Sequence, residues 1–419
     1  MPTKETEQTL RRCRFCAAPL EHVFIDLGTS PLANSYLKAD QLLQPEPVFP
    51  LIAYVCSSCF LVQLEELKSP TDIFSDYAYF SSFSDSWLAH AEEFSLEAAR
   101  RFNLDSTSLV VEIGSNDGYL LQYFKDSGLN VLGIEPAANV AQAAQDKGIK
   151  TLVRFFNAAL ASELAAAGQK ADLIIANNVL AHIPQTNDLM AGFKKLLKAE
   201  GTISIETPHL LNMIEENQFD TIYHEHYSYF SLNTFATICK AHQLEVYDLE
   251  TMATHGGSLR IFVGHVDYCH GKTSDAVKQG LAEEKRKGYQ DIRFYESYGA
   301  KVRQVKRNIL KGLIGLKEAG KSIAAYGAPA KGNTLLNYCG IGTDFIDYTV
   351  DRNPHKQGLY LPGSRIPIYG PEKIFETKPD YMLILPWNLK DEIIEQMALI
   401  KEWGGSFILP IPDFTIIKR

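Results

Sequence analysis

Strand-length apolar runs alternate with segments of helical period along most of the chain from about Ser106 onward. The first runs lead into amphipathic helices, and the last two of this series follow each other closely, as a closing pair of strands does. This alternation predicts a mostly parallel sheet with ligand sites at the carboxyl ends of its strands. The runs of this series are 108–114, 130–135, 172–178, 201–206, 246–251 and 257–264.

A charged segment of helical period, residues 272–320, separates this series from a second α/β series. The second series begins at Lys321, and its clearest strand-length runs are 344–351, 381–385 and 406–409. A chain of 419 residues is too long for one ordinary core. The pattern therefore predicts three domains: a small module over 1–66, a nucleotide-binding core over 67–270, and a helical connector with a C-terminal α/β domain over 271–419.

Composition and charge exclude several classes of function. The net charge is −9, and no basic block reverses it, which argues against nucleic acid as a partner. No apolar run reaches the ~18 residues needed to span a bilayer, and the polar segment 1–12 does not resemble a signal peptide. We therefore expect a soluble, cytoplasmic monomer with no membrane partner, in which thiols stay reduced.

Four of the seven cysteines form two C-x-x-C pairs within the first domain. Two thiolates on a tight turn can face one ion, and two such turns complete a tetrahedral four-thiolate site. A single pair could be a redox motif, but two pairs without a flanking βαβ pattern favour zinc. A closed ligand set leaves no position for a substrate, so we expect a structural Zn²⁺. Its predicted ligands are Cys13, Cys16, Cys56 and Cys59.

The turn after the first strand, residues 112–118, carries two glycines but lacks the third glycine of G-x-G-x-x-G. An acidic side chain beside this turn would suit a cationic ligand without phosphate, although an NAD-binding fold stays open as an alternative. The run resembles motif I of the class I S-adenosylmethionine-dependent methyltransferases. In that family the acidic residue after the second strand binds the ribose hydroxyls, and the segment after the fourth strand lies beside the donor. The donor-binding residues implied are Glu112, Gly114, Asn116, Asp117, Glu135, Asn177 and Asn178.

Two histidines, a carboxylate and three tyrosines lie within residues 221–230. A packed core would bury so many polar groups at a cost, whereas a histidine oriented by a carboxylate suits proton abstraction. An interfacial aromatic loop or a metal site remains an alternative. Because a methyl sulfonium is already a strong electrophile, the enzyme must create a carbon nucleophile, and a ketone acidifies its neighbouring C–H. Methylation of oxygen or nitrogen needs little beyond proximity, so the cluster favours carbon methylation.

Four further segments and the order of the three domains are similar to the sugar C-methyltransferases that act on nucleotide-linked 4-keto deoxyhexoses. The matching segments are 27–34, 223–229, 255–260 and 326–333. The resemblance implies a class I methyltransferase (Rossmann-like) core flanked by the zinc module and a C-terminal Rossmann-like domain. It also implies His226 as the base, with Glu225, Tyr223, His182 and Tyr77 around the sugar.

The C-terminal domain offers a binding site for the nucleotide-sugar. The turn 327–333 follows a strand and opens a helix, so its amides and lysine can receive a diphosphate, although an ordinary βα turn would look similar. The substrate-binding candidates are His224, Arg260, Lys331, Asn333, Asp351 and Arg352. We therefore expect methylation at carbon 3 of a nucleotide-linked 4-keto deoxysugar. An O- or N-methyltransferase and a non-catalytic Rossmann-fold binding protein are the alternatives.

Overall fold

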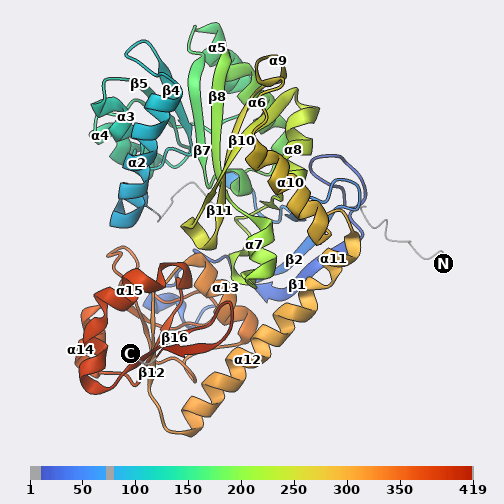
Figure 1. Cartoon of the computed structure of the whole chain (residues 1–419). Coiled ribbons are helices and arrows are strands. Elements are labelled where there is room, and N and C mark those ends of the chain that lie inside the picture. The colour runs from blue at the N-terminus through green and yellow to red at the C-terminus, as the bar shows by residue number, and fades with distance from the viewer. Residues whose placement is uncertain (1–10, 72–79, 418–419) are drawn as a thin grey trace, which may run out of the picture.

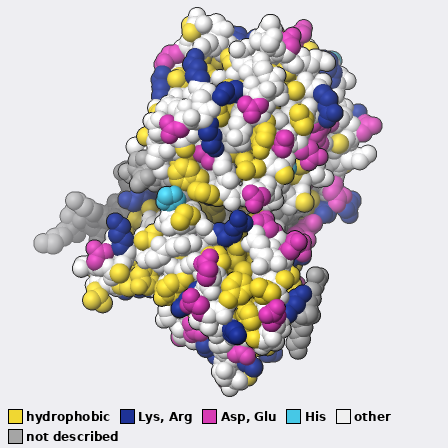
Figure 2. Space-filling view, turned by 90° about the vertical axis from the view of Figure 1, so that its left-hand side faces the viewer, with side chains coloured by type: hydrophobic (Ala, Val, Ile, Leu, Met, Phe, Trp, Pro, Cys, Tyr) yellow, Lys and Arg dark blue, Asp and Glu magenta, His cyan; other side chains and the backbone are white. Residues whose placement is uncertain are grey.

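The computed structural model describes residues 11–71 and 80–417, so the predicted sugar-pocket residue Tyr77 lies outside the described residues. Figure 1 shows a large upper α/β unit and a smaller lower one, with the N-terminal strands between them. The long helix α12 (Tyr298–Glu318) runs beside the N-terminal strands into the lower unit. The space-filling view shows the two units one above the other, with a hollow on this face where they meet (Figure 2). Among the described residues, no helix is long and apolar enough to cross a membrane.

The N-terminal module is a short antiparallel sheet that borrows its last strand from the core. Its order is β1-β2-β3-β9, and Val62 on β3 pairs with Tyr229 on β9. This pairing anchors the end of the histidine-rich segment 221–230 to the zinc module. The strands are β1 (His22–Ser30), β2 (Phe49–Val55), β3 (Val62–Leu64) and β9 (Ser228–Tyr229).

The upper unit contains a seven-stranded sheet, which confirms the predicted, mostly parallel arrangement. Strands β4, β5, β6, β7 and β8 are parallel, and β11 lies antiparallel between β8 and β10. The predicted closing pair is therefore a hairpin whose second strand inserts into the sheet. In spatial order the strands are β10 (Leu244–Met252), β11 (Ser258–His265), β8 (Leu197–Pro208), β7 (Ala171–Asn177), β4 (Leu109–Ile113), β5 (Asn130–Ile134) and β6 (Thr151–Leu152).

Helices cover both faces of this sheet, as right-handed βαβ crossovers require. Their apolar sides form two clusters of buried residues, one on each side of the strands. The helices of this unit are α2 (Asp85–Arg101), α3 (Leu121–Asp126), α4 (Ala138–Asp146), α5 (Ala158–Ala166), α6 (Thr186–Leu196), α7 (Leu210–Glu215), α8 (Leu232–Ala241) and α9 (Val266–Cys269).

The charged segment 272–320 forms three helices, α10 (Asp275–Lys287), α11 (Ile292–Glu296) and α12. Buried residues of α12 belong to one cluster that also holds residues of β1, β2 and the C-terminal sheet. The N-terminal module and the C-terminal domain therefore share a core, although they lie at opposite ends of the sequence. The boundaries after residues 66 and 270 stay a prediction.

The C-terminal domain is a six-stranded sheet, parallel except for its last strand. The predicted strand 344–351 is much shorter, because a turn closed by Ile346 N–H and Gly342 C=O leaves only Thr349–Val350 for pairing. The strands are β14 (Ile368–Tyr369), β13 (Thr349–Val350), β12 (Ile323–Tyr326), β15 (Tyr381–Ile384), β16 (Ser406–Leu409) and β17 (Thr415–Ile417), and the helices are α13 (Ala330–Cys339), α14 (Glu372–Thr377) and α15 (Lys390–Gln396).

Candidate active site and zinc site

The two C-x-x-C turns meet, as predicted. Sγ–Sγ distances are 3.5 Å for Cys13–Cys59, 3.5 Å for Cys16–Cys56 and 3.6 Å for Cys16–Cys59, and all four sulfurs lie within 4.8 Å of one another. Thiolates about 2.3 Å from a zinc ion form a tetrahedron with edges of about 3.8 Å, so the sulfurs are close to the spacing that one zinc ion requires.

Backbone geometry explains why both turns present their thiols alike. The residue after each pair, Ala17 and Phe60, has a left-handed φ of 61° and 59°. Each turn is closed by the same bond, from Ala17 N–H to the carbonyl of Cys13 and from Phe60 N–H to that of Cys56. Outside the thiol cluster, the Gln63 amide donates to Cys13 Sγ at 3.2 Å. None of these residues lines the cavity at the carboxyl ends of the core strands, which agrees with a structural role for the metal.

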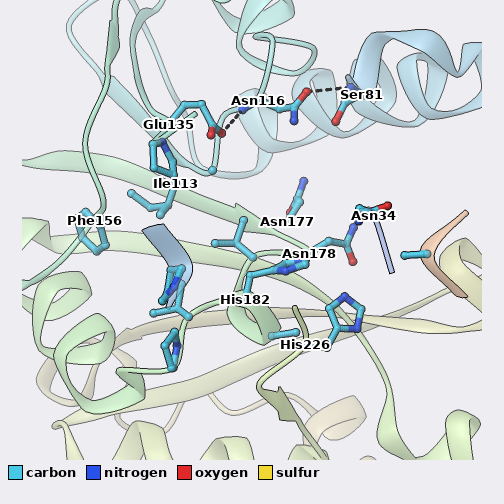
Figure 3. A pocket seen from close by; sticks show the side chains of 18 of the residues that line it. Asn34, Ser81, Ile113, Asn116, Glu135, Phe156, Asn177, Asn178, His182 and His226 are labelled. Atoms are coloured by element: carbon cyan, nitrogen blue, oxygen red, sulfur yellow. Dashed lines mark hydrogen bonds between the residues drawn. The ribbon is translucent and has the colours of Figure 1, made fainter. Parts of the chain in front are cut away.

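A cavity of about 730 Å³ lies at the carboxyl ends of the core strands, and side chains from all three predicted domains line it. Glu135 and Phe156 lie at one end, and Asn34 and His226 toward the other (Figure 3). Lys331, Lys356 and Asn388 of the C-terminal domain also line it. The cavity therefore places the motif I turn, the histidine cluster and the C-terminal domain around one space.

The motif I end has the features of a site for a ribose-bearing ligand. Gly114 has φ +66°, and a Cβ there would lie 2.6 Å from Val179 Cγ2, so no other residue fits this close turn. The buried Glu135 carboxylate accepts N–H groups from Asn116 at 3.0 Å and Ala137 at 2.9 Å (Figure 3). These bonds fix its orientation, and each oxygen keeps a lone pair for a hydroxyl group.

Two predicted donor-binding residues lie behind the cavity wall. Asp117 is buried and faces Lys147, whose Nζ lies 3.5 Å from Oδ2. Glu112 is buried beneath the turn, where desolvation raises its pKa well above the usual range. Neither lines the cavity, whereas Gly114, Asn116, Glu135, Asn177 and Asn178 do. Direct contact of Glu112 and Asp117 with the donor stays a prediction.

Replacing Glu135 by alanine should weaken S-adenosylmethionine binding. The side chain removed is a buried carboxylate with both oxygens oriented by backbone amides, and losing such a partner costs on the order of 1–3 kcal/mol. We expect a dissociation constant raised by about one to two orders of magnitude, measured by isothermal titration calorimetry. Retained donor binding, or loss of NAD binding instead, would contradict the assignment of this end of the cavity.

At the opposite end of the cavity, His226 lies between Tyr223 and His182 and contacts both. His226 Nδ1 lies 2.8 Å from the carbonyl of Thr221, and a carbonyl only accepts, so Nδ1 carries a proton. In the neutral ring Nε2 is then the basic atom, and it lies 2.6 Å from the Tyr223 hydroxyl. The His182 ring packs edge-on against His226 at 4.7 Å between centroids. All three side chains line the cavity.

His182 has the same tautomer for the same reason. Its Nδ1 donates to the backbone carbonyl of Glu225 at 2.9 Å. Burial lowers the pKa of His182 to about 4, so the ring is neutral near pH 7. With Nδ1 committed, Nε2 can accept a hydrogen bond but cannot donate one. His182 is therefore suited to receive a hydroxyl group rather than to stabilise an oxyanion.

Glu225 lies directly behind this wall. Its side chain is buried, and Asn34 Nδ2 donates to Oε1 at 2.7 Å. Desolvation raises the pKa of Glu225 to about 7. The carboxyl group is therefore close to its titration point at neutral pH.

Two predicted substrate-binding residues of the core lie away from the cavity. His224 Nε2 donates to the carbonyl of Pro50 at 3.1 Å, in the N-terminal module. Arg260 is buried against Glu206, with NH2 and Oε2 2.8 Å apart, and His90 contacts the same oxygen at 2.8 Å. Burial opposes ionisation of Glu206, yet these two neighbours lower its pKa to about 2. Neither His224 nor Arg260 lines the cavity, so their contact with a substrate stays a prediction.

Of the four C-terminal candidates, only Lys331 lines the cavity. Its Nζ donates to Asn388 Oδ1 at 2.8 Å. Asn333 Nδ2 donates to the Ala33 carbonyl at 2.6 Å, which ties α13 to the N-terminal module. The Asp351 carboxylate accepts the N–H of Ala328 at 2.7 Å and so shapes the turn before α13. Arg352 is exposed, 3.8 Å from Glu392.

Asn34, Lys356 and Trp87 are among the lining residues that sequence reasoning did not single out. Asn34 ends the segment 27–34. The similarity of this segment to a family pattern pointed to it, but predicted no role for any of its residues. Lys356 and Trp87 carried no local signal, because only the fold brings them to the cavity. Trp87 packs against His90 with ring centroids 5.0 Å apart, so it is supported by the buried Glu206 group.

Comparison with known proteins covers nearly the whole chain. Residues 13–74 match a family described as a zinc binding domain, 88–249 one described as "Methyltransferase domain", and 253–412 one described as "C-methyltransferase C-terminal domain". The chain is 37% identical over 406 residues to the C-methyltransferase NovU of Streptomyces niveus, covering 97% of this chain and 96% of that protein.

Two solved methyltransferase structures each match less than half of this chain. A S-adenosylmethionine-dependent methyltransferase from Anabaena variabilis has a TM-score of 0.38 and 13% identity, covering 48% of this chain and 99% of that chain. The magnesium protoporphyrin IX methyltransferase from Synechocystis, with bound S-adenosylmethionine, has a TM-score of 0.31 and 15% identity, covering 43% and 82%.

Proposed function

The chain belongs to the S-adenosylmethionine-dependent C-methyltransferases with an N-terminal zinc-binding domain, and we propose that its substrate is a nucleotide-linked 4-keto deoxysugar, methylated at carbon 3. The single observation that carries the proposal is the pair of His226 and Tyr223 in the cavity wall, at the end opposite Glu135. The four cysteines bind a structural zinc ion and take no part in the reaction.

A base and a hydrogen-bond donor side by side are what enolisation of a ketone requires. The Thr221 carbonyl holds the proton on His226 Nδ1, so Nε2 is the atom of the neutral ring that can take the proton of carbon 3. In the structure the Tyr223 hydroxyl donates to Nε2 at 2.6 Å. When the sugar binds, this hydroxyl would turn its proton to the keto oxygen, which stabilises the negative charge developing there and frees the Nε2 lone pair. Neutral His182 then accepts a hydrogen bond from a sugar hydroxyl, which fixes the ring against the base.

Residues of the motif I turn hold the donor. Gly114, Asn116 and Glu135 fit a ribose-bearing, cationic ligand, because the turn is close and the acceptor is fixed. Bound S-adenosylmethionine supplies an electrophilic methyl group for the nucleophilic carbon. The apolar lining around Ile113 and Phe156 excludes water from this end of the cavity.

Two lysines support binding of a nucleoside diphosphate where the C-terminal domain lines the cavity. Lys331 is the second residue of α13, and its ammonium group lies 4.7 Å from the centroid of the Trp387 ring. Lys356 Nζ donates to the Ala328 carbonyl at 2.9 Å, so both cations border the turn that precedes α13. Burial lowers the pKa of Lys331, while the nearby Asp220 opposes this, so a diphosphate would compensate a desolvated charge.

A panel of nucleoside diphosphate-linked 4-keto-6-deoxysugars, differing in base and in the substituent at carbon 3, tests the proposal. With S-adenosylmethionine present, we expect one product that is heavier by one methyl group, with nuclear magnetic resonance placing the methyl on carbon 3. Matched 4-hydroxy sugars serve as the control and should not react, because their C–H is not acidified. A methyl found on oxygen or nitrogen, or reaction of the 4-hydroxy sugars, would refute carbon methylation through an enolate.

A further inference from the structure

Asn34 brings an amide of the N-terminal module into the wall of the cavity. The residue lines the cavity together with Tyr223 and His226, and it lies toward the His226 end (Figure 3). Its amide Nδ2 donates to Glu225 Oε1 at 2.7 Å, across 191 positions of sequence. A carboxylate oxygen accepts, so this contact also fixes the orientation of the amide. The amide oxygen then faces the Tyr36 hydroxyl, 3.3 Å away.

The segment that carries Asn34 is held in place from the C-terminal domain. The Ala33 carbonyl accepts from Asn333 Nδ2 at 2.6 Å, and the Tyr36 hydroxyl donates to the Ala328 carbonyl at 2.6 Å. The first anchor is the residue before Asn34, and the second lies two residues after it. The amide is therefore presented on a backbone that two hydrogen bonds fix, which suits a residue that must orient another side chain.

Glu225 passes this orientation on to the histidines. Its carboxyl group accepts a hydrogen bond from Asn34 Nδ2, and its backbone carbonyl accepts one from His182 Nδ1 at 2.9 Å. His226 is the next residue in the chain. A shift of Glu225 would thus move both imidazoles. Glu225 Oε2 is buried and has no hydrogen-bond partner among the described residues, so Asn34 supplies the contact that defines the side-chain position.

We propose that Asn34 is a positioning residue of the sugar pocket, whose amide holds the Glu225 carboxyl group behind the histidine pair, so that the zinc-binding module contributes to catalysis. This rests on the proposed function and adds a role for the segment 27–34. The module then has two tasks. Its zinc site stabilises the fold, and its loop after β1 completes the catalytic centre.

The charges around Glu225 determine how its titration should respond. Lys356 attracts the ionised carboxylate from the C-terminal domain, and Tyr36 packs against Lys356. The hydrogen bond of His182 goes to the backbone carbonyl of Glu225. Asn34 donates to the carboxylate and so favours its charged form, which lowers the pKa of Glu225 against the effect of burial. Removing the amide should raise that pKa, and a carboxylate in its place should raise it further.

The experiment compares Asn34→Ala and Asn34→Asp with wild type, with Asn187→Ala as a matched control. Asn187 also joins the module to the core, because its Nδ2 donates to the Phe15 carbonyl at 2.9 Å, but it is exposed and outside the cavity. We expect kcat to fall by about ten- to a hundred-fold in both Asn34 variants. The acidic limb of the kcat–pH profile should move to higher pH, most in Asn34→Asp. Donor affinity and zinc content should stay unchanged, and the thermal midpoint should fall only slightly, because the buried Glu225 carboxyl group loses its partner. Asn187→Ala should behave as wild type.

A double-mutant cycle with Glu225→Gln decides whether Asn34 acts through Glu225. In the Glu225→Gln background, Asn34→Ala should cost little more, because the group that it positions is already changed. Fully additive losses, an unshifted pH profile, or an equal loss in Asn187→Ala would overturn the inference. Where Glu225→Gln is too slow for the cycle, the pH profile decides alone. Failure of wild type with every sugar of the panel would instead refute the proposed substrate.

Discussion

Replacing His226 by asparagine is expected to abolish methyl transfer while donor binding stays intact. Asparagine can still donate to the Thr221 carbonyl as Nδ1 of His226 does, but it has no atom that accepts a proton near neutral pH. General-base catalysis contributes about 10²–10⁴-fold, so the loss should be of that order or larger. Single-turnover measurement of methyl transfer gives the size of the loss, and calorimetry with S-adenosylmethionine tests donor binding.

His242→Asn is the matched control, since His242 lies outside the cavity and contacts Asn187 at 2.9 Å. Exchange with deuterated water gives a second test of the His226 variant. Wild type, given the sugar without donor, is expected to exchange the proton on carbon 3, and the His226→Asn variant is not. Full activity of His226→Asn would leave His182 as the remaining histidine of the cavity wall that could act as base. Normal turnover of both His226→Asn and His182→Asn would refute the enolate mechanism.

Replacing Cys56 by serine is expected to cause the largest loss of stability. Zinc binding to four-thiolate sites contributes about 10–16 kcal/mol of apparent free energy in zinc-finger peptides, and the metal is then part of the folding energy. The effect should reach the active site, because β3 of the module pairs with β9, which ends the segment 221–230. We expect about one zinc ion per wild-type chain, and a lower thermal midpoint with loss of zinc in the variant.

Cys239→Ser is the appropriate comparison, because Cys239 is buried in α8 and belongs to the core rather than to the thiol cluster. That variant should keep its zinc, whatever its stability. Metal analysis by mass spectrometry and thermal unfolding measure the two properties separately. A wild-type preparation that is metal-free and fully folded would contradict a structural zinc site.

Local spacing in the sequence was enough to predict much of the fold and part of the site. The zinc turns and the motif I turn depend on residues within a few positions. The structure brings the cysteines together, and it places Gly114 in a left-handed turn where a Cβ would clash with Val179. The strand over 344–351 was predicted too long, because apolar content alone does not reveal the turn closed by Ile346 and Gly342.

The histidine cluster shows the limit of local reasoning. Residues two apart would share a face in a strand, but His226 N–H bonds to the Tyr223 carbonyl in a turn. His226 consequently faces the cavity, whereas His224 faces Pro50 of the N-terminal module. Side-chain direction in such a segment is decided by the backbone path, and no periodicity in the sequence encodes it.

The sequence by itself determined the α/β class, the zinc ligands and the location of the donor turn, because each follows from short-range patterns of burial, spacing and backbone freedom. Only the tertiary structure decided which polar residues share the cavity. Asn34 meets Glu225 across 191 positions, and Ala33 meets Asn333 across 300. Such contacts arise because the N-terminal strands and the C-terminal domain bury a common apolar core, and packing of that kind is set by the whole chain rather than by any segment of it.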